Sequence, residues 1–391
     1  MTNYDFDKIT NRKGTNCLKY DFALERGKPA NILPFWVADM DFPVPEAVIE
    51  ALINRSKHGI FGYTDIKLDY LATLEKWFQL RHGWQIKKEA LVMTPGVVFA
   101  LAAAVRAFTK PGDAVLIQRP VYYPFSQVIE DNGRKLINNS LVEQAGRYTI
   151  DFVDFEQKII EHKIKLFILC NPHNPVGRVW TKDELLKLGQ ICVKQGVVVV
   201  ADEIHQEFTR LGHAHTVFAG LCAEFAEQTI TCTAPSKTFN LAGLQISNIF
   251  IENARLRAKF MKAVERVGYS QPNALGVVAA QAAYADGGPW LDELKVYLEL
   301  NLQKTQAFLV QHLPQVKLIE PEGTYLLWLD FSAYALATEV LEDKIVNEAG
   351  LWLDGGTMFG PEGSGFQRIN MACPWSVLEK GLQRLAIVFA Q

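Results

Sequence analysis

The sequence predicts an α/β protein in which a large domain with a mainly parallel, doubly wound sheet is joined to a smaller α+β domain. Between about residues 90 and 250, apolar runs typical of buried strands alternate with amphipathic stretches typical of helices. This alternation favours a parallel sheet covered by helices on both faces. After Pro314 the pattern changes to short strands with helices between them. With 391 residues the chain also exceeds the usual size of one domain.

The elements can be placed in chain order. A helix is expected to begin at Pro45, because Pro and the acidic Glu46 suit a first helical turn, and a second is expected over residues 99–108. Thr181 and Glu184 form a capping-box pattern that opens a third helix over Thr181–Val193. The strands predicted for the large sheet are Val115–Ile117, Leu166–Cys170, Val197–Val200, Thr229–Cys232 and Ile246–Ile251.

The remainder of the chain suggests where the domains divide. Residues 253–312 are helix-rich, with breaks at 270–273 and 286–289, and three later strands are expected at Val316–Ile319, Tyr325–Phe331 and Phe366–Met371. We therefore predict a large cofactor-binding domain over residues 46–285. The small domain is predicted to combine residues 1–45 with residues 286–391.

Composition and charge exclude several functional classes. The chain is 49% hydrophobic and 21% charged with a net charge of −3, which gives no reason to expect nucleic acid or an anionic membrane as a partner. No apolar stretch reaches the ~18–20 residues that span a bilayer, and the N-terminus lacks the pattern of a signal peptide. The six cysteines are scattered without a CxxC pair, so we expect reduced thiols rather than disulfides or a metal site. A cytoplasmic location is predicted.

Three polar residues each come just after a predicted buried strand: Lys237, Asp202 and Asn174. Ligands of doubly wound sheets bind beyond the carboxyl ends of the strands, so we expect these side chains to meet there. A pyridoxal phosphate enzyme needs an amine to form an imine with the aldehyde, a carboxylate to keep the pyridine nitrogen protonated, and an amide to donate to the ring 3-oxygen. Taken singly, each has a simpler interpretation: a surface lysine, a helix cap and an Asn-Pro turn.

Two of the candidates have competing neighbours. Glu203 follows Asp202 directly, and because adjacent strand residues point to opposite faces, only one of them can face the cofactor. Tyr122 is suited to stack on the pyridine ring, but Tyr123 competes with it, and either could be a core aromatic. Burial of Lys237 would favour its neutral, nucleophilic amine.

Two further segments suit the anionic groups of a cofactor and a substrate. Gly96, Val97 and Val98 lie where a strand passes into a helix, and backbone N–H groups at a helix start bind phosphate. A plain strand–helix junction is the simpler interpretation. Arg368 lies on a predicted strand, and its planar guanidinium matches an amino acid α-carboxylate, although an ordinary surface arginine is the alternative.

Together these residues resemble fold-type-I pyridoxal phosphate enzymes of the aminotransferase superfamily, whose fold is that of aspartate aminotransferase. More narrowly, the chain resembles the MalY/PatB-type carbon–sulfur lyases, often called cystathionine β-lyases. The motifs that carry this likeness run in order along the chain. They are residues 11–16 (NRKGTN), 36–42 (WVADMDF), 61–63 (FGY), 171–178 (NPHNPVGR), 201–205 (ADEIH), 236–244 (SKTFNLAGL) and 368–374 (RINMACP).

The resemblance implies a role for each residue. Lys237 would form the imine, Asp202 would pair with the pyridine, Asn174 would bond the 3-oxygen and Tyr122 would stack on the ring. Backbone of Gly96, Val97 and Val98 would hold the phosphate, with Ser236 and His205 as further cofactor-binding candidates, although packing is the simpler role for His205. Arg368, helped by backbone near Val37 and Ala38, would hold the substrate carboxylate. Tyr63 would reach the phosphate of a neighbouring subunit and Asn273 would approach the same site, which implies a homodimer with shared active sites.

Two positions depart from what relatives often carry. Ala234 replaces a serine that binds phosphate, and Gln245 stands where many aminotransferases have a phosphate-binding arginine, which the lyase subgroup also tends to lack. The grip on the phosphate would therefore depend on the helix start and on Tyr63.

The implied activity is β-elimination from L-cystathionine or other S-substituted cysteines, which gives a thiol, pyruvate and ammonia. An aminotransferase acting on amino acids and 2-oxo acids is the near alternative, because both reactions begin with removal of the Cα proton. An additional regulatory role through protein binding is a third hypothesis, for which the chain shows no evident interaction module.

Overall fold

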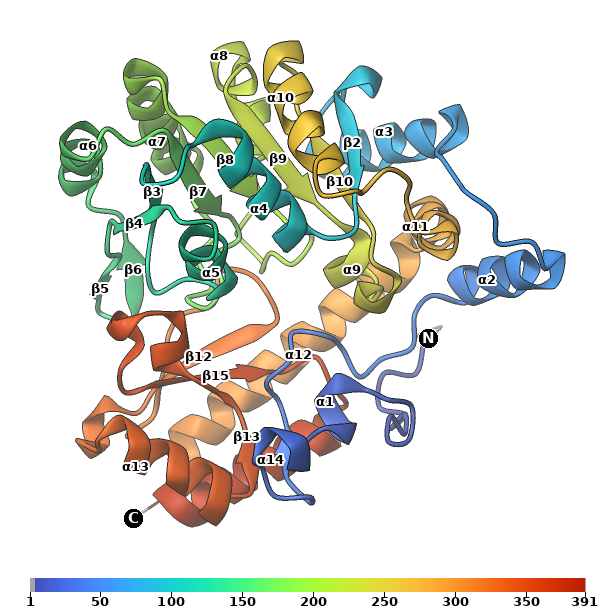
Figure 1. The fold of residues 1–391 in the computed structure, drawn as a ribbon. Helices are drawn as coiled ribbons and strands as arrows, with labels where there is room; N and C mark the ends of the chain where they lie inside the picture. The colour runs from blue at the N-terminus through green and yellow to red at the C-terminus, as the bar shows by residue number, and fades with distance from the viewer. Residues whose placement is uncertain (1–3, 391) are drawn as a thin grey trace.

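The computed structural model describes residues 4–390, so residues 1–3 and 391 of the predicted small domain lie outside the described residues. A seven-stranded sheet forms the upper half of the molecule in Figure 1 and has the order β2-β10-β9-β8-β7-β3-β4. Among these described strands, β10 runs opposite to the other six, which all point the same way. The predicted fold class is confirmed. The strands are β2 (Leu91–Thr94), β3 (Ala114–Ile117), β4 (Lys135–Asn138), β7 (Leu166–Cys170), β8 (Val198–Asp202), β9 (Thr229–Thr233) and β10 (Ser247–Phe250).

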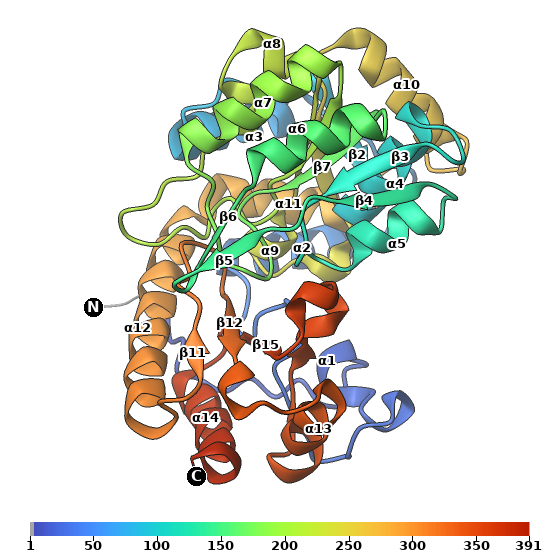
Figure 2. The ribbon, with the colours of Figure 1, turned by 90° about the vertical axis from the view of Figure 1, so that its left-hand side faces the viewer.

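Helices cover both faces of this sheet because its strands are apolar on both sides. In β7, Leu166 and Ile168 belong to the cluster packed under α4, α5 and α10, whereas Phe167 and Leu169 belong to the cluster under α6 and α7. The two helical layers can be followed in Figures 1 and 2. Their helices are α4 (Val97–Phe108), α5 (Pro124–Glu130), α6 (Phe152–Glu161), α7 (Lys182–Gln195), the short α8 (Ala223–Ala226) and α10 (Ala254–Glu265).

The local signals in the sequence act as expected at several helix ends. The Thr181 hydroxyl accepts a hydrogen bond from the Glu184 N–H at 3.2 Å, and the Glu184 carboxylate accepts one from the Thr181 N–H at 2.8 Å. The capping box that opens α7 is therefore confirmed. α2 (Glu46–His58) begins one residue later than the predicted start at Pro45, which is its N-cap, and α3 (Leu68–His82) follows it.

The second sheet lies below the first in Figure 1 and is antiparallel, with the order β11-β12-β15-β14. Long helices pack against it. α11 ends at Asp286 and α12 begins at Gly288, close to the predicted division between the domains at residues 285–286. That division stays a prediction. The elements are β11 (Lys317–Leu318), β12 (Leu326–Asp330), β14 (Asp354–Gly355), β15 (Phe366–Asn370), α11 (Ala274–Asp286), α12 (Gly288–His312), α13 (Thr338–Asp343) and α14 (Trp375–Phe389).

The N-terminal segment connects the two halves. After α1 (Leu18–Asp21), β1 (Leu33–Pro34) pairs in parallel with β13 (Leu351–Trp352). Residues 36–42 are then held from both sides: Asn240 donates to the carbonyls of Met40 and Phe42, and Asn370 donates to those of Val37 and Asp39. This segment is thereby fixed beside the carboxyl ends of the large sheet. No helix among residues 4–390 is long and apolar enough to cross a membrane.

Candidate active site

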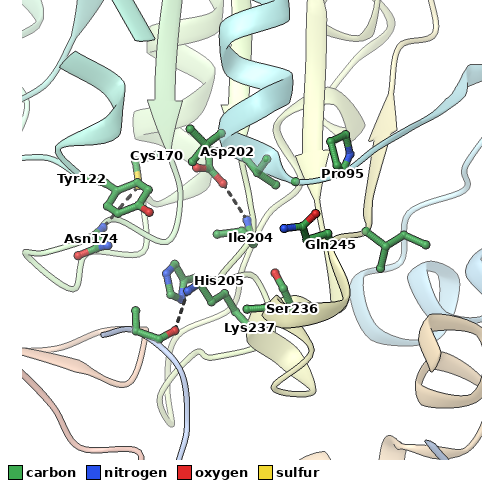
Figure 3. Close-up of a pocket in the computed structure, with 16 residues that line it drawn as sticks. Pro95, Tyr122, Cys170, Asn174, Asp202, Ile204, His205, Ser236, Lys237 and Gln245 are labelled. Carbon is green, nitrogen blue, oxygen red and sulfur yellow. Dashed lines mark hydrogen bonds between the residues drawn. The ribbon is translucent and has the colours of Figure 1, made fainter. Parts of the chain in front are cut away.

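Four strands of the large sheet end at one edge, and a pocket of about 190 Å³ lies there. β8 ends at Asp202, and β9 is followed by the short helix α9 (Pro235–Thr238), which carries Lys237. Asn174 follows β7, and the start of α4 follows β2. Figure 3 shows how these side chains converge. The pocket is lined by Ala38, Pro95, Gly96, Val97, Val98, Tyr122, Cys170, Asn174, Asp202, Ile204, His205, Ser236, Lys237, Ala242, Gln245 and Ile246.

Lys237 reaches from α9 toward the N-terminal segment. Its Nζ donates a hydrogen bond to the Ala38 carbonyl at 2.6 Å, shown as a dashed line in Figure 3. Desolvation lowers the pKa of Lys237 to about 8, with the charge of Asp39 opposing this shift and that of Arg368 adding to it. A substantial share of the amine is therefore neutral near physiological pH, as a nucleophile that forms an imine requires.

Asp202 faces the pocket, and its rival does not. The Asp202 carboxylate accepts a hydrogen bond from the Ile204 N–H at 3.2 Å, and burial raises the pKa of this carboxyl to about 7. Glu203 points to the opposite side of the strand, where it accepts from the Phe218 N–H at 2.8 Å and contacts His215 at 3.1 Å. Strand alternation thus leaves Asp202 as the carboxylate that a cation in the pocket would meet.

Asn174 is oriented by Arg368. The Nη1 of Arg368 donates to Asn174 Oδ1 at 3.0 Å, which leaves the amide nitrogen of Asn174 to donate elsewhere. The Asn174 carbonyl accepts from the Tyr122 N–H at 3.0 Å and so places Tyr122 at the pocket wall. Tyr123 is not among the lining residues, so the structure brings Tyr122 rather than Tyr123 to the pocket.

The opposite end of the pocket suits an anion. Gly96, Val97 and Val98 line it at the start of α4, a 12-residue helix whose first N–H groups have no partner within the helix. A β-carbon built on Gly96 would meet nothing within 4 Å, so open space adjoins this backbone. Ser236 and Gln245 lie at the same end (Figure 3).

Four predicted residues are not among those that line the pocket: Tyr63, Asn273, Val37 and Arg368, the last of which adjoins it through its hydrogen bond to Asn174. Tyr63, on the connection between α2 and α3, is 98% exposed and lines a separate groove that also contains Asn273. The Asn273 side chain caps α11 by accepting from the Leu275 N–H at 2.9 Å. Val37 contributes its carbonyl to Asn370. Within one chain, then, neither Tyr63 nor Asn273 joins Lys237.

The structure adds residues that sequence reasoning missed. Tyr325, fully buried at the start of β12, donates its hydroxyl to the Ala38 carbonyl at 3.0 Å, the same oxygen that accepts from Lys237. Asp354 on β14 forms an ion pair with Arg368. Both follow from pairings between distant segments, for which the local sequence carries no signal.

The chemistry of the pocket fits the predicted cofactor. An amine that can be neutral, from Lys237, and a helix start suited to an anion line different parts of the pocket, and the aromatic ring of Tyr122 is at its wall. Burial raises the pKa of Asp202 in the protein alone, and a cation against it, such as a protonated pyridine, would stabilise its negative charge. His205 has a buried Nδ1 without a partner among the described residues, and burial beside Lys237 and Arg368 holds its pKa well below the usual value, so this imidazole is neutral.

A pocket of this kind at the carboxyl edge of a mainly parallel sheet, with a second, antiparallel sheet beneath it, defines an enzyme with the aminotransferase fold. The aminotransferase class I and II family matches residues 30–385, and the chain belongs to this family. Cystathionine beta-lyase PatB of Bacillus subtilis is 49% identical over 97% of this chain and 98% of its own length.

Solved structures agree over the whole length. The PLP-bound putative aminotransferase of Clostridium difficile superimposes with a TM-score of 0.96 at 42% identity, covering 99% of this chain and 100% of its own. The PLP-bound C-S lyase of Staphylococcus hominis gives a TM-score of 0.93 at 35% identity, covering 100% of this chain and 99% of its own.

Proposed function

We propose that this protein is a pyridoxal 5'-phosphate-dependent carbon–sulfur lyase of the cystathionine β-lyase type. It would convert L-cystathionine and other S-substituted cysteines to a thiol, pyruvate and ammonia. The observation that carries this proposal is that Lys237, Asp202 and Asn174 line one pocket, with Arg368 hydrogen-bonded to Asn174. The full-length similarity to proteins named as lyases supports the choice of reaction.

The chain provides a distinct group for each part of the cofactor. Lys237 would hold the aldehyde carbon covalently and Asp202 would pair with the pyridine nitrogen. The Asn174 amide would donate to the 3-oxygen, and the start of α4 would hold the phosphate. Tyr122 lines the pocket where it can cover the ring. Ser236 and His205 would complete the enclosure.

The cofactor supplies an electron sink for the pair of electrons released at the substrate Cα. Arg368 would fix the substrate carboxylate, and with it the direction of the Cα–H bond. Lys237, freed by the substrate amine, would take the Cα proton, which its lowered pKa permits near neutral pH. The negative charge of Asp202 would favour a protonated pyridine throughout. The β-sulfur then leaves with the bonding electron pair.

An aminotransferase is the second candidate, because it uses the same residues up to removal of the Cα proton. The high similarity to a structure named a putative aminotransferase supports this second candidate. The two activities differ in their products: a lyase releases pyruvate from L-cystathionine without a 2-oxo acid, whereas an aminotransferase needs one.

The test is to assay pyruvate and thiol from L-cystathionine with the cofactor-loaded protein, alongside Lys237→Ala and the surface control Lys259→Ala. Removing the covalent nucleophile and base should lower kcat by roughly 10³-fold or more. The Lys259 variant should match the parent, because this residue is exposed on α10. Amino transfer to a 2-oxo acid with no pyruvate from any cysteine thioether would reject the lyase and support the aminotransferase.

We also infer a homodimer with shared sites. Tyr63 is almost fully exposed, and Phe61 and Ile60 beside it are 59% and 67% exposed. A groove of about 650 Å³ runs between this loop and residues 268–275. Three exposed apolar side chains next to such a groove suit contact with a second copy, in which Tyr63 would reach the partner's phosphate.

A further inference from the structure

Arg368 already carries an internal carboxylate where the substrate carboxylate is expected. Asp354 on β14 lies directly opposite Arg368 on β15, and paired residues of an antiparallel ladder share one face. Each residue is 3% exposed. Among residues 4–390, Arg368 is the one cation within salt-bridge distance of Asp354.

The hydrogen bonds of Arg368 leave no complete fork for a second carboxylate. Nη1 donates to Asn174, and Nη2 donates both to the Trp36 carbonyl at 2.7 Å and to Asp354 Oδ2. Nε has no partner among the described residues. A guanidinium grips a carboxylate with two parallel N–H groups, either Nη1 with Nη2 or Nε with Nη2, and both pairs include Nη2. An incoming carboxylate must therefore take the place of one acceptor of Nη2.

Asp354 is the acceptor that can yield. Trp36 belongs to a backbone segment fixed by neighbouring hydrogen bonds from Phe35 to Trp352 and from Asn370 to Phe35. Asp354 holds Arg368 through a side chain that can rotate. It also lines a second cavity of about 460 Å³ whose wall includes two cations, Arg26 and Lys28, and one other carboxylate, that of Glu342. A displaced carboxylate thus has room, and the two cations outnumber the one other carboxylate on this wall.

We propose that Asp354 is a positioning residue that holds Arg368 in the absence of substrate, gives up this guanidinium to the α-carboxylate of an entering amino acid, and thereby sets how tightly amino acids bind. The proposal rests on the proposed function, because it takes Arg368 as the carboxylate site. Its consequence is that each binding event exchanges one ion pair for another, which weakens affinity for every α-amino acid alike.

The experiment compares the cofactor-loaded parent with Asp354→Asn, which keeps an oxygen acceptor for Nη2 but removes the charge. L-Alanine is the probe, because it binds through amine and carboxylate and has no β-leaving group. Its dissociation constant is read from the change in the cofactor's absorption. We expect a dissociation constant lower by about fivefold or more, since a neutral amide competes less well than a carboxylate. With L-cystathionine, KM should fall more than kcat changes.

Two further variants keep the outcome decisive. Asp354→Ser also removes the charge and should shift the dissociation constant in the same direction. Asp330→Asn makes the same chemical change on β12, where the carboxylate caps the Ser332 N–H, and should bind L-alanine like the parent. Binding by both Asp354 variants that is as weak as in the parent, or weaker, would overturn the proposal. The two proposals can also fail separately. If the Asp354 variants bind L-alanine more tightly but the parent releases no pyruvate from L-cystathionine, the role of Asp354 is supported and the lyase assignment is contradicted.

Discussion

At the residue scale, burial moves the two central ionisable groups in opposite directions. Desolvation lowers the pKa of Lys237 to about 8 and raises that of Asp202 to about 7, so near neutral pH a part of each group is uncharged in the protein alone. The cofactor brings an electrophilic carbon to the first and a cationic nitrogen to the second. Burial thus suits the pocket to its ligand, and it does so by destabilising the charged forms of both side chains relative to water.

The pKa of Lys237 predicts how cofactor capture depends on pH. Only the neutral amine attacks the aldehyde, so the rate of yellow colour formation by the cofactor-free protein should rise with pH and level off above about pH 8. An unperturbed lysine would level off near ~10.4. Rapid-mixing absorbance between pH 6 and 10 measures this rate.

Asp39 provides the control for that profile. Its negative charge raises the pKa of Lys237, so Asp39→Asn should move the midpoint to lower pH. A midpoint above pH 9 in the parent, or a shift to higher pH in the variant, would contradict the assigned environment of Lys237.

Site residues could be predicted where the neighbouring sequence marks them, and not where only the pairing of distant strands places them. Asp202 is the last residue of one apolar strand and Lys237 lies on the short helix after the next, and those positions alone implied a shared edge. The choice between Asp202 and Glu203 needed the strand register, which the structure settles in favour of Asp202. Asp354 could not be found, because only the pairing of β14 with β15 places it opposite Arg368.

At the element scale, the start of α4 combines two properties needed for phosphate binding. The helix directs free N–H groups into the pocket, and Gly96 leaves open space in front of them. Because the φ of Gly96 is 169°, this glycine is in extended backbone that any residue can adopt. Gly96 therefore matters because it has no side chain to fill the space in front of the helix start.

Gly96→Ala should therefore weaken cofactor binding more than it weakens the fold. The added methyl group would occupy the space before the helix start, and we expect affinity for pyridoxal phosphate to fall about tenfold, the effect of losing one or two charge-assisted hydrogen bonds. Stability of the cofactor-free protein should fall by at most about 1 kcal/mol, as for a changed N-cap. Equilibrium titration and thermal unfolding measure the two effects.

Asp151→Ala is the matched control, because Asp151 caps α6 outside the pocket by accepting from the Val153 and Asp154 N–H groups. It should cost similar stability without changing cofactor affinity. Equal cofactor affinity in Gly96→Ala and the parent would mean that the phosphate is not held at the start of α4.

Elements with strong apolar patterns were predicted, and exposed ones were not. The buried strands β7, β8 and β9 lie within two residues of their expected bounds. The hairpin of β5 (Val142–Gln144) and β6 (Arg147–Thr149) was missed: β5 is exposed throughout, so it has no apolar alternation to detect. β4 is half-buried at the edge of the sheet and was missed for the same reason.

At the scale of the whole molecule, the N-terminal segment makes the site depend on both halves of the chain. Ion pairs fix residues 39–41 from one side: Arg12 contacts Asp39 and Asp41, and buried Lys19 contacts Asp41 at 2.9 Å. The carbonyl of Ala38 then accepts a hydrogen bond from Lys237 on α9, which follows strand β9 of the large sheet, and that of Trp36 accepts one from Arg368 of the small sheet. No short stretch of sequence could have predicted this arrangement, which joins four distant segments.

The proposed dimer can be tested by mixing two inactive variants. Lys237→Ala lacks the nucleophile but keeps Tyr63, and Tyr63→Ala lacks the residue expected to reach across but keeps Lys237. In a mixed dimer, one site would combine the intact Lys237 of one subunit with the intact Tyr63 of the other, because exchange across a two-fold axis is reciprocal. Random reassociation makes about half of the dimers mixed with one complete site each, so activity should recover to about 25% of the parent.

Pyruvate release after the variants are unfolded together and refolded measures this recovery, and the variants refolded separately and then combined give the baseline. Tyr63→Phe, which keeps the ring but loses the hydroxyl, should also be restored when mixed with Lys237→Ala, if the hydroxyl is the group that contacts the phosphate. Activity that stays at the baseline, while sequential purification through two different affinity tags recovers mixed dimers, would mean that each subunit completes its own site. Tyr63 would then be an exposed side chain with no part in catalysis, and the grip on the phosphate would belong to α4 and its neighbours alone.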